Sequence, residues 1–168
     1  DFELAIQWLM DAGIVHKVSR IREPKMPLKF YEDIDAFKLF LLDCGLFACM
    51  TDAPADQMLI GDNVFTEFKG AFTEQYVMQQ LLVLGIKPYY WSNAKTPAEI
   101  DIVVQYNNRV VPVEVKAEVN VRARSLAQFV KDNPELKGLR ISMKGYADQE
   151  WMENIPLVAI GAYFTPQT

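Results

Sequence analysis

Two carboxylates and a lysine are spaced so that they could bind a metal ion and act on a phosphate ester. They are Asp101, Glu114 and Lys116, and they lie on either side of Asn107-Asn108. Asparagine tolerates the left-handed backbone angles that two-residue hairpin turns require. A hairpin centred on this dipeptide places Asp101 opposite Glu114, and Glu99 opposite Lys116. Because side chains alternate along a strand, Asp101, Glu114 and Lys116 share one face.

The pairing of the two carboxylates needs compensation, because like charges directly opposite each other destabilise a sheet. A lysine, a metal ion or both would supply it, and Mg²⁺ or Mn²⁺ suits carboxylate ligands, with the Val115 carbonyl as a further oxygen. Glu74, in a preceding helix, is the candidate for a third metal ligand and for a second catalytic residue beside Lys116. The alternative is a solvated sheet face whose ion pair contributes at most ~1 kcal/mol.

The metal ion would polarise a phosphate and help to form hydroxide from water. Lys116 would orient the attacking water and stabilise the charge that develops on the phosphate. Glu99 is interpreted as an ion-pair partner of Lys116, although it could also be a further ligand. The remaining alternate positions of the hairpin predict an apolar opposite face: Ile100, Ile102, Val104, Val111, Val113 and Val115.

Several elements are expected to position these residues. Apolar residues at three- and four-residue spacing predict a helix over residues 65–84, ended by Gly85. A strand is expected from Pro88, followed by the hairpin and by a basic amphipathic helix over residues 122–132. Two further strands are expected at residues 139–143 and 155–160. The prediction is an α/β fold with a mixed sheet flanked by helices.

The first sixty residues predict a separate group of secondary-structure elements. Residues 1–10 predict a helix, and residues 14–21 and 37–42 predict strands. A helix and two strands are typical of a winged-helix unit entered partway, although a short α/β extension explains them equally well. The polar stretch 51–62 marks a boundary. We therefore expect a winged-helix-like segment and linker over residues 1–60, and a second domain over residues 61–168.

The composition narrows the class of protein. The chain has 168 residues, a net charge of −5 and 23% charged residues, which argues against broad, non-specific nucleic-acid binding. Arg122, Arg124 and Lys131 could still contact phosphates, although a solvated helix face explains them as well. The chain lacks a signal peptide and a membrane-spanning apolar run, and its two cysteines suit a reducing compartment. A cytoplasmic location, and a chain that is part of a longer protein, are the predictions.

In order along the chain, the motifs resemble those of a known superfamily. Asp101, Glu114-Val-Lys116 and the helical Glu74 are similar to the PD-(D/E)xK nucleases, which have the restriction-endonuclease-like fold. Five sequence segments resemble the C-terminal region of a prokaryotic AAA-type ATPase family, a domain of unknown function. They are residues 37–46, 70–74, 89–91, 98–102 and 112–116. Pro97 stands four residues before Asp101, which departs from the literal Pro-Asp pair of the superfamily.

The resemblance implies roles for these residues. Asp101 and Glu114 resemble metal ligands, Lys116 resembles the catalytic lysine, and Glu74 resembles the helical acid of Holliday-junction-resolvase-like members. It also implies an N-terminal ATPase module as a partner. ATP would bind only there, because this chain contains no Gly-x-x-x-x-Gly-Lys-[Ser/Thr] motif.

Two functions are compatible with the sequence. One is a Mg²⁺-dependent nuclease-like module that binds or cleaves DNA. The other is a non-catalytic module that regulates the ATPase half and keeps a dormant site.

Overall fold

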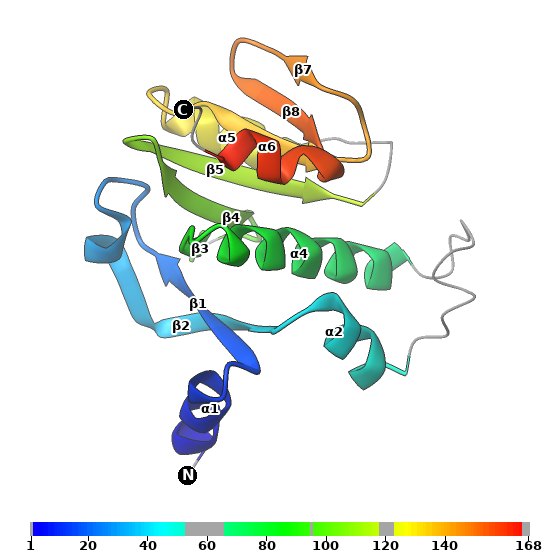
Figure 1. Ribbon diagram of the computed structural model, residues 1–168. Helices are drawn as coiled ribbons and strands as arrows, with labels where there is room; N and C mark the ends of the chain where they lie inside the picture. Colours follow the sequence, from blue (N-terminus) through cyan, green and yellow to red (C-terminus); the bar gives the residue numbers. More distant parts are fainter. Residues whose placement is uncertain (1, 53–65, 95, 118–122, 166–168) are drawn as a thin grey trace.

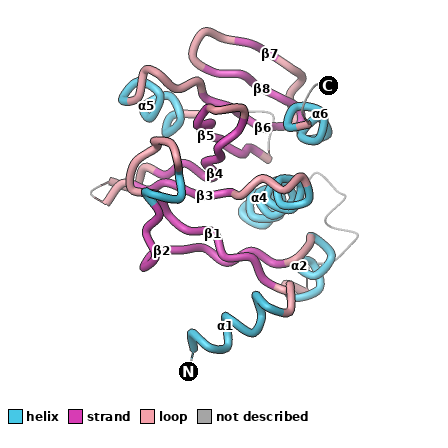
Figure 2. The backbone as a smooth tube through the Cα atoms, turned by 60° about the vertical axis from the view of Figure 1, so that its left-hand side comes forward, coloured by secondary structure: helices cyan, strands magenta, loops and turns pink. Residues whose placement is uncertain are grey.

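A single eight-stranded mixed sheet organises the molecule in the computed structural model, which describes residues 2–52, 66–94, 96–117 and 123–165. The strand order is β2-β1-β3-β4-β5-β6-β8-β7. The pairs β1/β3, β5/β6 and β6/β8 are parallel and the others are antiparallel. The α4, α2 and α6 helices lie on one face of the sheet and α5 lies on the other (Figure 2).

The central hairpin has the predicted turn and register. β4 (Glu99–Tyr106) and β5 (Arg109–Lys116) are joined at Asn107 and Asn108, whose φ angles are 49° and 57°. Ile102 pairs with Val113 and Tyr106 with Arg109, which is the register that a two-residue turn at this dipeptide dictates. The prediction of the hairpin is therefore confirmed.

The helix α4 (Thr66–Val83) covers one face of the sheet and ends where Gly85 adopts a φ of 72°. Its buried side chains belong to the same hydrophobic core as apolar residues of β4, β5 and β6. The short helix α6 (Ile160–Phe164) packs on the same face through both of its terminal residues. The buried core on this face includes Val77, Met78, Leu81, Ile102, Val104, Val111, Val113, Val115, Leu139, Ile141, Ile160 and Phe164.

The helix α5 (Arg124–Asp132) covers the opposite face with Leu126, Phe129 and Val130. Its C-terminal cap is Asn133, whose side chain donates a hydrogen bond to the Phe129 carbonyl (2.8 Å). The strands beyond β5 are β6 (Gly138–Ser142), β7 (Ala147–Asp148) and β8 (Met152–Pro156), followed by the 3₁₀ turn η3 (Leu157–Ala159).

The N-terminal segment extends the same sheet. It consists of α1 (Phe2–Asp11), β1 (Val15–Ile21), η1 (Leu28–Tyr31), β2 (Glu32–Leu41) and α2 (Cys44–Met50). β1 pairs with β3 (Pro88–Ser92) in parallel, so the predicted boundary at residues 60 and 61 does not separate two sheets. The side chain of Gln75 in α4 forms hydrogen bonds with both the N–H and the carbonyl of Leu41, at 3.1 and 2.8 Å.

Two of the element predictions were wrong in part, and α2 was not predicted. β2 begins at Glu32 rather than at residue 37. Asp43 caps α2, because its side chain accepts the Leu46 N–H at 2.7 Å. Residues 157–160, which were predicted as part of a strand, turn into η3 and the start of α6, because Pro156 ends the pairing of β8 and the chain turns back over the α4 face.

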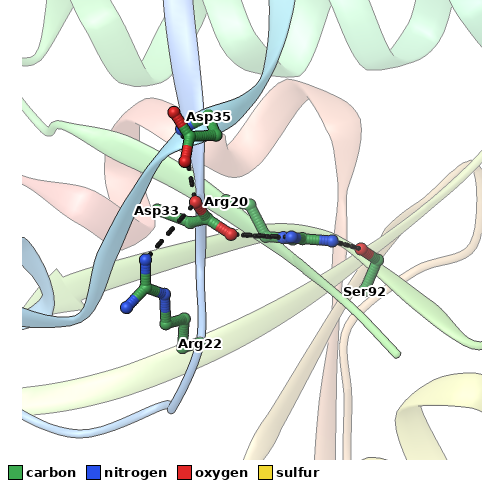
Figure 3. Close-up of polar contacts among 5 residues, drawn as sticks. All are labelled: Arg20, Arg22, Asp33, Asp35 and Ser92. Atoms are coloured by element: carbon green, nitrogen blue, oxygen red, sulfur yellow. Dashed lines mark hydrogen bonds and ion pairs between the residues drawn. The ribbon is translucent and has the colours of Figure 1, made fainter. Parts of the chain in front are cut away.

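A polar network fixes the N-terminal hairpin to the rest of the sheet (Figure 3). Arg20 lies between two partners: its Nη2 is 2.6 Å from Asp33 Oδ2, and its Nη1 donates to Ser92 Oγ at 3.5 Å. Arg22 reaches Asp33 Oδ1 at 3.6 Å, and the Asp35 N–H donates to the same oxygen at 3.2 Å. The network spans the register shift between Ser19 and Arg20, and so fixes the position of β2.

Replacing Asp33 with asparagine is expected to remove an acid-sensitive part of the stability. The hydrogen bond from Arg20 holds the pKa of this carboxyl below its usual range. An acid with a lowered folded pKa adds stability above its unfolded pKa, near 4, and loses it as the pH falls. Asp33→Asn should therefore lower the Tm at pH 7 and lower it less at pH 3. Equal losses at both pH values would contradict this account.

Candidate metal and phosphate site

Asp101 lies at an irregularity of β4 next to the middle of the sheet. Tyr89 pairs with Val103 whereas Trp91 pairs with Ile100, so β4 contains one more residue than β3 between these pairs. An extra residue of this kind bends the strand and redirects a side chain. The Asp101 Oδ2 atom accepts the backbone N–H of Val115 in the neighbouring strand at 2.8 Å. The bulge thus brings the Asp101 carboxylate to the end of β5.

The same irregularity corrects one prediction about the faces of the hairpin. Ile102 belongs to the core on the α4 face, but Ile100 packs with Val103 in the core on the α5 face. Strict alternation would have placed Ile100 and Ile102 together. The extra residue interrupts the alternation between them, so Ile100 was assigned to the wrong face.

Glu114 is the most deeply buried acid of the candidate site, with 5% of its surface exposed. Its Oε1 atom lies 2.6 Å from Lys116 Nζ, and Arg140 is its register partner in β6. Its Oε2 atom is buried and has no hydrogen-bond partner among the described residues. A buried carboxylate oxygen without a partner is costly, and a cation is one way to satisfy it.

The surroundings of Asp101 favour the protonated, neutral form of its carboxyl group. Burial raises the pKa of Asp101 to about 7, with repulsion from Glu114 and Glu74 adding to the effect. The hydrogen bond from the Val115 N–H and the charge of Lys116 oppose this rise. A carboxyl in this state gains from any cation that approaches it, and such perturbed acids cluster at functional sites.

Glu74 lies next to a lysine that was not among the predicted site residues. Lys38, in β2, forms a short ion pair with Glu99 and lies 3.5 Å from Glu74 Oε1. Glu74 Oε1 is nevertheless buried without a hydrogen-bond partner among the described residues. The prediction that Glu99 pairs with Lys116 was wrong, because Glu99 forms its ion pair with Lys38, whereas Lys116 pairs with Glu114 in its own strand.

The residues fit a metal ion held by few protein ligands better than a full cage. Within the described ranges, no three Asp, Glu, His or Cys side chains converge closely enough to hold a metal ion. Mg²⁺ usually keeps several waters and takes only one or two carboxylates. Asp101 and Glu114, with the unpaired Glu114 Oε2, supply such a pair. Glu74, which was predicted as a third ligand, is instead held near Lys38.

The residues predicted to contact nucleic acid follow Asp101 and Glu114 in the sequence. Arg124 and Lys131 are exposed on α5. Arg122 lies outside the described residues. Exposure is compatible both with phosphate contact and with a solvated helix face, so it does not choose between them.

Sequence reasoning missed Lys38 and Arg140. Lys38 carried a signal, since it is the one charged residue within the otherwise apolar run of residues 36–42. A lysine at a half-buried strand position requires a partner of opposite charge. Arg140 gave no comparable signal, because it lies next to Glu114 only through the parallel pairing of β5 and β6, which no local sequence pattern predicts.

The part of the chain that the structure describes contains no helix long and apolar enough to cross a membrane. A family model described as "Domain of unknown function (DUF4143)" matches residues 69–163, which is more than half of the chain. A second model, "Domain of unknown function (DUF8612)", matches residues 1–57. The two matches fall on either side of the predicted boundary. No curated protein and no solved structure matches the chain.

Proposed function

The chain belongs to DUF4143, a family of domains of unknown function found in AAA-ATPase-associated proteins, and we propose that it is a nuclease-like module acting on DNA phosphodiesters with Mg²⁺. The observation that carries the proposal is that Asp101 lies close enough to Glu114 and Lys116 for both charges to act on its pKa, with Glu114 Oε2 buried and unpaired in the described structure. The proposal includes a restriction-endonuclease-like core and an ATPase module as partner.

The order of elements supports that core. A helix carrying Glu74 is followed by three antiparallel strands, a helix on the opposite face and a strand parallel to the third. The candidate residues come from the first helix and from the second and third strands. Their order and placement agree with the resemblance on which the assignment rests.

Each side chain has a role in this proposal. Asp101 and Glu114 would hold Mg²⁺, which supplies polarisation of the phosphate and a lower pKa of water when bound. Lys116 is fixed by Glu114, and its ammonium would orient the attacking water and stabilise the negative charge that grows on the phosphate oxygens. Arg124 and Lys131 would contact the backbone of the DNA.

A second function is favoured by a different observation. Lys38 and Lys116 already neutralise part of the acidic cluster without any metal ion. A module whose site is closed by its own lysines would keep the fold and lack the reaction. Such a module would regulate or dock the ATPase half.

The experiment compares DNA cleavage by the wild type, Asp101→Asn and Lys116→Ala. Linear, branched and single-stranded DNA would be incubated with each protein in Mg²⁺ or Mn²⁺. Lys29→Ala serves as a control, since it removes an exposed lysine of η1 that has no role in the proposal and leaves the acids and α5 intact. Cleavage by the wild type and the control, lost in the other two, supports the nuclease. Absence of cleavage from every wild-type reaction favours the regulatory module.

A further inference from the structure

Lys38 brings a positive charge from the N-terminal hairpin into the acidic cluster. Its ammonium group pairs with Glu99, lies 3.5 Å from Glu74 Oε1 and stands 4.9 Å from the centre of the Tyr90 ring. The two acids come from α4 and β4, so one lysine joins three separate elements. The residue belongs to the part of the chain that the DUF8612 model matches, whereas its partners belong to the DUF4143 match.

The lysine remains charged in this environment. Burial lowers the pKa of Lys38, but the carboxylates of Glu74, Glu99 and Asp101 outweigh that effect and raise it overall. A buried ammonium with several carboxylate neighbours is a fixed local cation. It therefore acts on the same acids that a divalent cation would approach.

The surrounding contacts fix where Lys38 lies. It pairs across the hairpin with Val18, a fully buried core residue. On one side Gln75 of α4 bonds both backbone groups of Leu41, and on the other Arg20 ties Asp33 to Ser92. The position of Lys38 thus depends on the packing of the whole hairpin and not on one flexible side chain.

We propose that Lys38 is the resident counter-ion of the carboxylate cluster, which keeps Glu74 from acting as a metal ligand and weakens divalent-cation binding at Asp101 and Glu114. This inference rests on the proposed metal site. The N-terminal hairpin then sets the metal affinity of the site that the rest of the chain builds. Any movement that withdraws β2 would release Glu74 and strengthen metal binding.

Coulomb repulsion gives the direction and scale of the effect. A unit charge and a doubly charged ion a few ångströms apart repel each other appreciably even at the effective dielectric constant of a partly exposed protein site. Removing the lysine charge is therefore expected to tighten binding of a divalent cation by at least about tenfold, with Glu74 becoming available as a further oxygen ligand.

The test titrates Mn²⁺ into the 168-residue chain at pH 8 by calorimetry, with thermal shift as a second readout. Lys38→Met is compared with the wild type and with Lys17→Met. Lys17 is a matched control, because it lies in β1 next to Leu39 on the opposite face of the hairpin, over the Phe37 ring. The double variant Lys38→Met/Glu99→Gln guards against misfolding, since it removes both charges of the pair.

Binding at least about tenfold tighter in Lys38→Met or in the double variant, with Lys17→Met unchanged, supports the inference. Tighter binding in these variants with none in the wild type also supports it, and would mean that Lys38 keeps the site dormant. Affinities within twofold of a wild type that does bind Mn²⁺ overturn the inference and leave the proposed function standing. No binding by any of the proteins overturns both.

Discussion

Asp101→Asn should stabilise the metal-free protein by about 2 kcal/mol at pH 8 and by less than half as much at pH 5. The pKa of this carboxyl is raised from 3.8 to about 7, chiefly by burial. Asparagine keeps the shape and can still accept the Val115 N–H, but it cannot ionise. The substitution therefore removes only the cost of a negative charge.

The direction follows from counting protons. Between pH 4 and pH 7 the folded protein holds a proton on Asp101 that the unfolded chain has released. Stability therefore falls as the pH rises through this window, and it stays low above pH 7. The figure of about 2 kcal/mol is roughly half of what the full pKa difference would give, since solvent screens a side chain that is partly exposed.

Urea unfolding at pH 5 and pH 8 with a chelator measures the effect. Asp132→Asn is the control, because Asp132 is an exposed aspartate of α5 that accepts a hydrogen bond from Gln128, as an asparagine carbonyl also could. Added Mg²⁺ should stabilise the wild type more at pH 8 than at pH 5, since the cation binds the ionised acid. Asp101→Asn that destabilises the metal-free protein at pH 8 would contradict the assigned environment.

Lys116→Met is expected to destabilise the fold by about 2 kcal/mol at neutral pH. Glu114 is 5% exposed, and the substitution takes away the ammonium group that lies 2.6 Å from its Oε1 atom. Removing one partner of a buried pair leaves an uncompensated charge, which costs far more than breaking a surface ion pair. Arg140 in β6 limits the loss, because its positive charge also acts on Glu114.

A double variant separates the charge from the packing. Glu114→Gln/Lys116→Met replaces both charged groups by neutral ones of similar size, so it should recover most of the stability lost in Lys116→Met. Denaturant unfolding of the wild type, both single variants and the double variant completes the cycle. A loss below about 0.5 kcal/mol in Lys116→Met would mean that the pair behaves as an exposed surface contact.

The local chemistry of the chain was enough to predict the hairpin. Asn107 and Asn108 specify the turn, and the turn specifies the register, so the pairing of β4 with β5 needed no knowledge of distant residues. The helix α4 was equally readable, since its apolar spacing is regular and Gly85 ends it. These are cases in which one short segment contains all of the information.

The misses share a different cause. The bulge at Asp101 arises from the pairing of β4 with β3, and Lys38 reaches Glu99 only because β1 and β2 extend the same sheet. No local sequence pattern predicts either the bulge or this ion pair. Residues 157–160 were read as strand because the run 155–160 is apolar and partly β-branched, while the turn through η3 into α6 depends on packing against α4. Contacts between segments distant in sequence set the finer geometry of the site.

The central claim is that Asp101 and Glu114 form a divalent-cation site, and calorimetric titration of Mn²⁺ into the 168-residue chain at pH 8 tests it most directly. The account predicts saturable binding by the wild type or, where Lys38 closes the site, by Lys38→Met. It also predicts that Asp101→Asn/Glu114→Gln abolishes that binding while the fold is kept. Equal binding with and without the two carboxylates, or none by any folded variant, would contradict the account.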